Sequence, residues 1–389
     1  MHPDSPDFYA LDELLTDEQK LVRQTTRDFV EKEIRPIIDD YAQRAEFPQH
    51  LVRKFGETGL FGPTIPAEYG GGGLDAISYG LMCQEIERGD SGLRSVVSVQ
   101  SSLVMGPIFA YGNEEQKQRF LPKLASGAWL GCFGLTEPDF GSNPGGMKTR
   151  FVEDGDHVVL NGSKLWITNS PLADVAVVWA KNGAGKIKAL LVERGMAGFS
   201  TPEIHRKWSL RASTTGELVF ENVRVPKENI LPGADGLRGP LGCLDQARYG
   251  ISWGAVGAAI DCYETARNYA AERIQFDKPI ASFQLVQKKL AEMLTAITQA
   301  QLLCWRLGTL KMAGKATTAQ ISMAKRANVE MALNVAREAR QILGGMGITG
   351  DFPIMRHLMN LESVVTYEGT HDIHLLILGA EITGIPAFK

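Results

Sequence analysis

Apolar positions recur along the chain with two different periods, and the change of period divides the chain into three parts. From Thr16 to about residue 128, apolar residues stand three and four apart, the spacing of one helix face. Between about 129 and 235 they alternate in short β-branched runs, which is typical of strands, and the helical spacing then returns. We therefore predict a helical domain over 1–128, a β domain over 129–235 and a helical domain over 236–389.

Local signals place some element ends. Thr16 with Gln19, and Asn113 with Gln116, have the spacing of capping boxes, which predicts helices beginning directly after Thr16 and Asn113. Asn161-Gly162 stands between two alternating runs and predicts a hairpin, because both central residues of a type I′ turn need positive φ.

Two apolar faces stand out in the C-terminal third. They are formed by Val286, Leu290, Met293, Ile297, Cys304 and Leu307, and by Ile321, Ala324, Met331, Val335 and Ile342. Long helices of this kind favour an up-down bundle that buries one face internally and has another available for a second subunit.

Composition limits the partners. The 389 residues are 44% hydrophobic and 22% charged with a net charge of -4, so no nucleic-acid or lipid-surface partner is expected and the substrate should be small. The five cysteines are odd in number and widely spaced, which predicts neither a disulfide framework nor a zinc site. No apolar run of roughly 18 residues and no targeting segment is recognised, so we expect a cytoplasmic protein.

Two short patterns have competing interpretations. "GMGITG" from Gly345 fits the dinucleotide fingerprint, but it follows a helical pattern, so we expect a helix end there. His371 and His374 beside Asp372 suit a metal, yet a helix start capped by Thr370 is favoured because no further ligand set is evident.

Three further features are weighed on pattern alone. Arg94 is the lone charge in an apolar, hydroxyl-rich stretch, and a salt bridge with Glu87 is favoured over a substrate anion. The loop 132–147, with Thr136 and Ser142, offers backbone N–H groups to a ligand, although a plain surface loop is commoner. For Trp166, the core is favoured over stacking on a cofactor.

Five segments nevertheless resemble, in order and spacing, the flavin-dependent acyl-CoA dehydrogenases over essentially the whole chain: "CFGLTEPDFGSNPG", "WITNS", "RIQFDKPIASFQLVQKKLAEM", "QILGGMG" and "YEGTHDIH". "GLRSVVSVQSSLVMGPI", "WSLRAS" and "LDQARYGI" make the chain most similar to the glutaryl-CoA dehydrogenases. The resemblance implies an α+β fold with a helical N-terminal domain, a middle β-barrel or sandwich and a C-terminal four-helix bundle. It also implies a homotetramer, an electron-transfer flavoprotein as acceptor, and a bacterial cytoplasm or, after removal of a transit peptide, the mitochondrial matrix.

The resemblance implies FAD, extended between domains and reaching a neighbouring subunit. The residues expected around the flavin ring and ribityl chain are Phe133, Leu135, Thr136, Ser142, Trp166, Ile167 and Thr168. Those expected at the pyrophosphate and adenosine are Arg273, Phe276, Gln284, Gln341, Gly344 and Gly345, and Thr370 and Asp372 complete the set. Asp277, where the family has glycine, is expected to repel the pyrophosphate unless its side chain turns away.

The resemblance also assigns the chemistry. Glu368 would remove the α-proton of the acyl-CoA while a β-hydride leaves for flavin N5, and burial should raise its pKa toward neutrality. Arg94 would hold the free carboxylate of a five-carbon diacid, and glutaryl-CoA would become crotonyl-CoA and CO2. The residues expected to assist at the substrate are Ser95, Ser98, Glu87, Tyr367, Ser142, Arg248 and Gly369. The alternatives are a dehydrogenase that stops at glutaconyl-CoA, and one for short or branched acyl chains.

Overall fold

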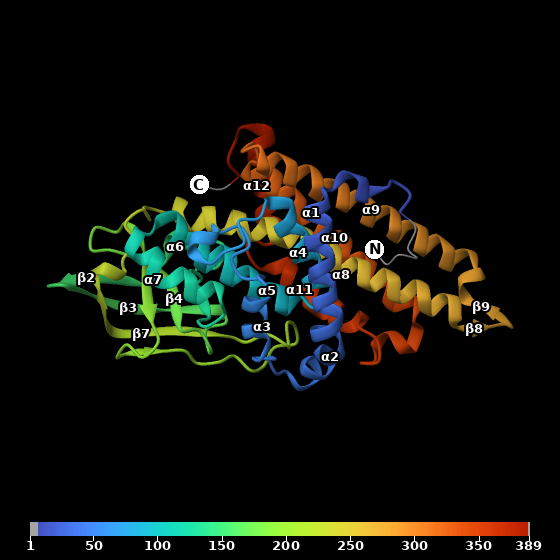
Figure 1. Ribbon diagram of the computed structural model, residues 1–389, viewed down its shortest axis with the longest axis horizontal. Coiled ribbons are helices and arrows are strands. Elements are labelled where there is room, and N and C mark those ends of the chain that lie inside the picture. Colours follow the sequence, from blue (N-terminus) through green and yellow to red (C-terminus); the bar gives the residue numbers. More distant parts are fainter. Residues whose placement is uncertain (1–6, 388–389) are drawn as a thin grey trace.

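A computed structural model describes residues 7–387, which form a helical, then a β, then a helical region (Figure 1). The N-terminal α-helices are α1 (Asp17–Phe29), α2 (Arg35–Arg44), α3 (Leu51–Glu57), α4 (Ala76–Gly89), α5 (Ser91–Ser98), α6 (Gly106–Tyr111) and α7 (Glu114–Ala125). The middle strands are β1 (Gly131–Gly134), β2 (Arg150–Asp154), β3 (His157–Thr168), β4 (Val175–Lys181), β5 (Ile187–Glu193), β6 (Phe199–Ser200) and β7 (Thr215–Pro226). The C-terminal elements are α8 (Arg238–Glu272), β8 (Ile274–Gln275), β9 (Lys278–Pro279), α9 (Gln284–Met312), α10 (Thr318–Ile342), α11 (Ile354–Thr366) and α12 (His371–Thr383). The predicted α+β class is confirmed.

Both predicted capping boxes are confirmed. The Thr16 hydroxyl accepts a hydrogen bond from the Gln19 backbone N–H at 3.2 Å, and the Gln19 side chain accepts one from the Thr16 N–H at 3.1 Å. Asn113 and Gln116 make the same reciprocal pair at 2.9 and 3.0 Å. These helix starts depend only on neighbouring residues, which is why the sequence predicts them well.

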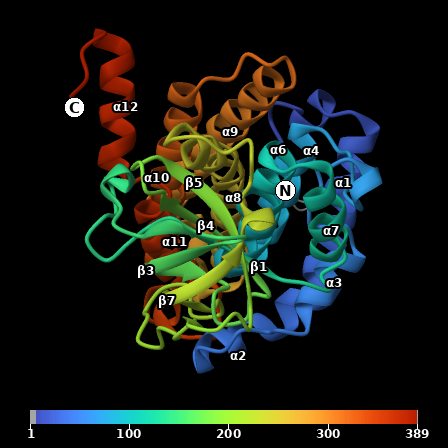
Figure 2. The ribbon, with the colours of Figure 1, turned by 90° about the vertical axis from the view of Figure 1, so that its left-hand side faces the viewer.

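The seven middle strands form one sheet in the order β1-β4-β2-β3-β7-β6, with β5 paired to β4. Strand β4 alternates between two cores. Val175, Val177 and Trp179 belong to the apolar cluster shared with the N-terminal helices, whereas Ala176 and Val178 belong to a second cluster within the β region. The N-terminal helices therefore cover one face of the sheet, as Figure 2 shows.

The predicted turn at Asn161-Gly162 is wrong. Both residues lie inside β3, which pairs with β7 on either side of an irregularity between Leu160 and Gly162. Gly162 has φ 139°, and a Cβ there would stand 2.5 Å from the Thr149 hydroxyl oxygen. The glycine therefore serves a bulge and a close approach, while the β2–β3 turn lies at Gly155, where φ is 60°.

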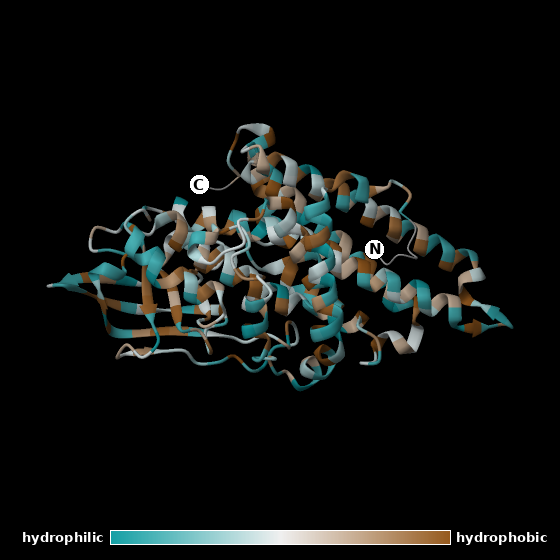
Figure 3. Ribbon diagram, viewed as in Figure 1, coloured by the Kyte–Doolittle hydropathy of each residue, from teal (hydrophilic) through white to brown (hydrophobic). Residues whose placement is uncertain are grey.

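The C-terminal helices pack as a bundle in which α8 contacts α9, α10 and α11, and α4 from the N-terminal region packs along α8. Small residues allow that approach: a Cβ on Gly257 would lie 1.8 Å from the Gln84 carbonyl oxygen, and one on Gly80 would meet the Trp253 ring. Hydrophobic and hydrophilic residues alternate along these helices (Figure 3). The N-terminal and C-terminal helices thus share an interface in the middle of the molecule.

The stretch Ser91–Tyr111 is helical throughout, with π-helical turns at Val99–Met105 between α5 and α6. Among residues 7–387 this is the one stretch that would pass as a membrane span by length and composition, although the sequence analysis expected none, and 83% of that window is buried inside the protein. All five cysteines are buried and free. Among residues 7–387, no group of three His, Cys, Asp or Glu side chains is placed to hold a metal ion.

Candidate active site

Glu368 lies in the short turn that joins α11 to α12. Its φ is 54° and that of Gly369 is 99°, so two consecutive residues have left-handed backbone. Such a conformation costs a non-glycine residue about 1 to 3 kcal/mol and persists only where neighbours enforce it. Thr370 then caps α12 by accepting a hydrogen bond from the Ile373 N–H at 3.3 Å, which confirms the predicted helix start.

Two buried cations hold the carbonyl groups of this turn. Arg248 donates from Nε to the Glu368 carbonyl oxygen at 2.7 Å. The Lys325 ammonium on α10 lies 2.9 Å from the Gly369 carbonyl oxygen, 3.2 Å from that of Tyr367 and 3.5 Å from that of Val365. The backbone around Glu368 is therefore fixed from both sides.

Glycine is needed at position 369 for a second reason besides its positive φ, namely the close approach of two side chains. A Cβ built on it would stand 2.9 Å from His374 Nε2 and 3.4 Å from an Arg248 guanidinium nitrogen. His374 is fully buried and both its ring nitrogens lack a partner, and burial lowers its pKa to about 3. A neutral imidazole thus packs directly under the turn.

The Glu368 carboxyl group is suited to proton transfer. Its Oε2 atom is buried and has no hydrogen-bond partner in the protein. Burial raises its pKa from 4.5 to about 7, against the opposing effect of Arg94, Arg248 and Lys325. The predicted shift toward neutrality is confirmed, and the unpaired oxygen is free to meet a proton on a ligand.

Arg94, on α5, is fully buried beside Glu368. Its Nε donates to Glu87 Oε2 at 2.6 Å, and its Nη2 donates to the Tyr367 hydroxyl. Although burial disfavours the charge, the Glu87 carboxylate holds the pKa of the guanidinium well above its ordinary value. The salt bridge favoured from pattern alone is confirmed.

The pair nevertheless leaves donors and acceptors unused. Arg94 Nη1, Glu87 Oε1 and the Ser98 hydroxyl are buried without a hydrogen-bond partner, and Ser95 is buried next to Arg94 in the same helix. Buried polar atoms are rarely left unpaired, and groups of them mark places where a ligand or water completes the bonding. Arg94 therefore has one N–H-bearing nitrogen left for an additional acceptor.

Gly254 on α8 makes room for this pair. A Cβ at that position would lie 2.0 Å from Glu87 Oε2 and 3.2 Å from Arg94 Nε. The sequence analysis missed Gly254, and it also missed Lys325. A signal for Lys325 was present, because it shares a helix face with Ile321, Asn328 and Ala332, as a lone cation among buried residues.

Most of the residues expected at the flavin ring lie at or just after the ends of β1 and β3, two strands that contact each other. Phe133 and Leu135 are buried at the end of β1, and the Leu165 N–H donates to the Thr136 carbonyl oxygen at 2.9 Å, which brings the two loops together. Ile167 is buried, Thr168 is partly buried, and Ser142 lies exposed in the loop after β1.

The prediction that Trp166 belongs to the core is wrong. Its side chain is 59% exposed and its φ is 63°, within an irregular part of the β3–β7 pairing between Lys164 and Ile167. A bulge of this kind re-aims a side chain, and here it turns a large planar ring outward. An exposed indole beside two threonines fits the face of a flavin ring.

The residues expected at the nucleotide end lie in the C-terminal region. The β8–β9 hairpin, with Arg273 and Phe276, and the sheet occupy opposite ends of the long axis (Figure 1). Gln284, Gln341, Gly344 and Gly345 are exposed as well, and Gln341 accepts a hydrogen bond from Lys289 on α9 at 2.9 Å. Asp372 is exposed in the first turn of α12. Within one chain, the hairpin and the sheet are thus well separated.

The hairpin at this end has a two-residue turn with positive φ at both central residues, 52° at Phe276 and 58° at Asp277. This is the conformation predicted for Asn161-Gly162, formed instead by residues that rarely adopt it. Phe276 is 86% exposed and Asp277 is exposed. The segment from Gly344 to Ile348 forms a tight helical turn after α10, which confirms a helix end at "GMGITG".

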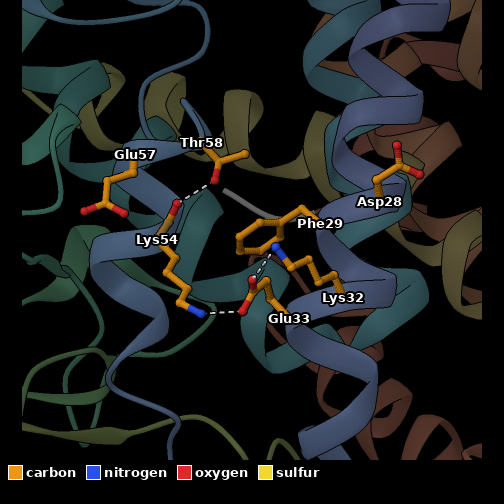
Figure 4. Close-up of a pocket in the computed structure, with 7 residues that line it drawn as sticks. All are labelled: Asp28, Phe29, Lys32, Glu33, Lys54, Glu57 and Thr58. Atoms are coloured by element: carbon orange, nitrogen blue, oxygen red, sulfur yellow. Dashed lines mark hydrogen bonds and ion pairs between the residues drawn. The ribbon is translucent and has the colours of Figure 1, made fainter.

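A pocket of about 350 Å³ lies elsewhere, between α1 and α3, and is lined by Asp28, Phe29, Lys32, Glu33, Lys54, Glu57 and Thr58 (Figure 4). Lys54 is paired with Glu33, and the Thr58 hydroxyl donates to the Lys54 carbonyl oxygen at 2.7 Å. Lys32 also pairs with Glu33, and none of the site residues described above lines the pocket.

Family comparisons agree with this arrangement. Residues 16–128, 132–223 and 234–383 match the N-terminal, middle and C-terminal domains of acyl-CoA dehydrogenase. The chain belongs to the acyl-CoA dehydrogenase family. A curated relative described as a short-chain specific acyl-CoA dehydrogenase, from Clostridium acetobutylicum, is 38% identical over 95% of this chain and 98% of its own.

Solved structures extend the comparison. The glutaryl-CoA dehydrogenase of Mycobacterium smegmatis is 49% identical, with a TM-score of 0.95 over 97% of this chain and 98% of that one. The same enzyme solved in complex with FADH2 gives a TM-score of 0.96 and covers 98% of both chains. A structure described as the electron transferring flavoprotein of Acidaminococcus fermentans is 36% identical, with a TM-score of 0.92 over 95% of this chain and 98% of that one.

Proposed function

We propose that this protein is an FAD-dependent dehydrogenase that oxidises glutaryl-CoA and decarboxylates it to crotonyl-CoA and CO2. The observation that carries the proposal is Arg94, a fully buried arginine with Nη1 unpaired, beside a buried carboxyl group on Glu368. The CoA thioester of a diacid has a free carboxylate that Arg94 can bind and an α-proton that Glu368 can remove. The 49% identical glutaryl-CoA dehydrogenase supports the assignment.

FAD is the cofactor, since the chain belongs to the acyl-CoA dehydrogenases and the M. smegmatis neighbour was solved with FADH2. The exposed indole of Trp166, with Thr136 and Thr168 nearby, fits the ring. When bound, FAD supplies the acceptor for the β-hydrogen and its two electrons. The exposed β8–β9 hairpin lies at the opposite end of the long axis from the sheet, so we propose that another chain completes the nucleotide end and that the protein is a homotetramer.

In the first step, Glu368 removes the α-proton. The α C–H bond breaks and an O–H bond forms on the carboxylate. A base with a pKa of about 7 is well matched to this transfer near neutral pH, whereas a solvated carboxylate is a much weaker base. Arg248 holds the Glu368 carbonyl group and so fixes the direction from which the base approaches.

Arg94 orients the substrate from its other end. Its Nη1 donates to the terminal carboxylate of the acyl chain, while Nε and Nη2 stay bound to Glu87 and the Tyr367 hydroxyl. Ser98 offers its unpaired hydroxyl to the same carboxylate. Arg248, which donates to the Glu368 carbonyl oxygen, is our candidate for contact with the thioester end of the substrate.

Decarboxylation follows from the product of oxidation. The bond between the γ-carbon and the terminal carboxylate breaks, its electrons flow through the new double bond to the thioester carbonyl, and CO2 leaves. Glu368 returns its proton to the resulting carbanion. The Glu87 carboxylate, with Oε1 unpaired, lies close to the departing carboxylate and repels it, which favours the loss of CO2.

A second function is favoured by a separate observation. Glu87 already balances the positive charge of Arg94. A monoacid chain such as butyryl would therefore leave Arg94 with an unused N–H donor but with its charge still compensated. The 38% identical short-chain relative supports this alternative. We also propose an electron-transfer flavoprotein as the electron acceptor, supported by the similarity to the A. fermentans structure.

The deciding experiment follows the acyl-CoA products of the FAD-loaded protein by mass, with glutaryl-CoA or butyryl-CoA and an artificial electron acceptor. Crotonyl-CoA from glutaryl-CoA supports the proposal in full, and glutaconyl-CoA removes only the decarboxylation. Arg94→Gln should lower kcat/KM for glutaryl-CoA by about 10² to 10³-fold and that for butyryl-CoA far less. An equal loss with both substrates would make Arg94 an internal salt-bridge residue.

A further inference from the structure

The turn that carries Glu368 has a third charged neighbour that the proposed mechanism leaves without a role. We propose that Lys325 is a positioning residue that holds this turn in its left-handed conformation and sets the charge of Glu368. The proposal rests on Glu368 being the base, and not on which acyl-CoA is the substrate.

The geometry is that of a clamp on alternate carbonyl groups. The Lys325 ammonium faces the carbonyl oxygens of Val365, Tyr367 and Gly369. Arg248 donates a hydrogen bond to the carbonyl oxygen of Glu368, which lies between the last two of these. The Val365 carbonyl belongs to the last turn of α11, where a cation also meets the negative end of the helix dipole. Loss of the ammonium would leave these groups unsatisfied in the interior.

Lys325 is also fully buried, so its charge must be matched nearby. The side chains that face it electrostatically are Glu368, Arg248, Arg94, His371 and His374. Only Glu368 among these is an acid. Burial lowers the pKa of Lys325 to about 7, and Glu368 opposes that change.

The two groups are therefore coupled. When Glu368 is ionised, it stabilises the ammonium form of Lys325, and the ammonium in turn favours the carboxylate. A proton taken up by Glu368 from the substrate removes the counter-charge of Lys325. This coupling distinguishes a positioning residue that acts on the base from a lysine that merely fills space.

The test is a double-mutant cycle of thermal unfolding with the full-length holoprotein, measured from pH 5 to pH 9. It compares wild type, Lys325→Met, Glu368→Gln and the double variant. Near pH 7, where Glu368 is partly ionised while Lys325 still carries its proton in part, the two substitutions should be clearly non-additive, because Glu368→Gln removes the partner of the ammonium. At pH 5, where Glu368 is protonated, the non-additivity should vanish. Additive effects at every pH would overturn the proposal.

Ser322→Ala is the matched control, because Ser322 is buried one turn earlier on α10 with an unpaired hydroxyl. It should be additive with Glu368→Gln at all pH values, and pH-dependent coupling in this pair as well would also overturn the proposal. If Lys325→Met does not fold, Lys325→Gln replaces it in the same cycle. Because the cycle needs no turnover, it remains decisive even if wild type oxidises neither glutaryl-CoA nor butyryl-CoA, which would remove the proposed function alone.

The kinetic readout uses whichever of the two acyl-CoA esters wild type oxidises faster. Lys325→Met should lower kcat by about 10² and move the acidic limb of the kcat profile to higher pH by about one unit, since the base loses a favourable cation. Lys325→Arg should keep the limb where wild type has it. An unmoved limb in Lys325→Met would refute the effect of Lys325 on the charge of Glu368.

Discussion

The two ends of the expected cofactor site differ in how completely one chain determines them. At the catalytic end, Lys325 or Arg248 contacts every carbonyl group of residues 365–369 except that of Thr366. The side chains of Arg94 and Glu87 there are buried. At the nucleotide end, Arg273, Phe276 and their neighbours are exposed on a two-stranded hairpin. The chain thus fixes the turn of Glu368 by itself, whereas the residues expected at the nucleotide end are exposed.

Of the substitutions at the catalytic end, we expect Glu368→Gln to have the largest effect. The amide keeps the shape but cannot accept the α-proton, so kcat should fall by about 10² to 10⁴-fold while FAD content is unchanged. Steady-state kinetics and the flavin absorbance of the purified variant measure both. Turnover within tenfold of wild type would mean that another residue is the base.

The same substitution should stabilise the fold. The pKa of Glu368 is raised in the folded protein, so its ionisation opposes folding: stability is fully present below about pH 4.5 and is lost as the pH rises through about 7. At roughly 1.4 kcal/mol per pKa unit, Glu368→Gln should gain up to about 3 kcal/mol at pH 8 and little at pH 4.5. Chemical denaturation at the two pH values measures the difference.

Gly254→Ala probes the support beneath Arg94. The new methyl group would collide with Glu87, which cannot move without releasing Arg94. We expect kcat/KM for glutaryl-CoA to fall by about 10 to 10²-fold and stability by about 1 to 3 kcal/mol. Gly242→Ala, on the same helix with only the Tyr111 hydroxyl near it at 3.6 Å, is the control and should change neither.

The pH profile of wild type gives a smaller effect. Because only the ionised carboxyl group accepts a proton, kcat should fall toward acid pH with a midpoint near 7 and approach a tenfold loss per unit below it. A midpoint near 4.5 would indicate that Glu368 is solvated during turnover. Product release that is slower than chemistry would be revealed by the absence of a deuterium effect from α-labelled substrate.

The smallest effect is expected at the nucleotide end. Asp277→Asn removes the charge and keeps a side chain that tolerates positive φ, whereas Asp277→Gly removes the charge and the strain together. If the hairpin contacts the pyrophosphate, both should tighten FAD binding a few-fold, measured by flavin retention during dialysis at low salt. No change in either variant would place Asp277 away from the phosphates.

Sequence reasoning succeeded where the determinants are local or periodic. The capping residues Thr16, Asn113 and Thr370 act on backbone groups three residues away, and the helical period persists over long segments. It failed at Asn161-Gly162 and Trp166, because pairing with β7 and contact with Thr149 decide the backbone of β3 there. Tertiary contacts of this kind are invisible in a local pattern.

The candidate site shows the same division. The role of Glu368 was assigned through resemblance, whereas Arg94 and its salt bridge with Glu87 were expected from pattern alone, because Arg94 is the lone charge in an apolar stretch. Lys325 lies 43 positions before Glu368, and Gly254 lies 167 positions after Glu87, so their roles depend on how α8, α10 and α11 pack. Physical contacts between distant elements are what the structure adds.

The five buried cysteines have a practical consequence. Burial raises the pKa of the thiols of Cys83, Cys132, Cys243 and Cys304 to about 12, so none is poised to react with maleimides or iodoacetamide in the native state. A cysteine introduced at exposed Lys278 on the hairpin would then be the one thiol open to a fluorophore or spin label. The native cysteines would therefore not need to be replaced before such labelling, which could test whether this protein is an oligomer.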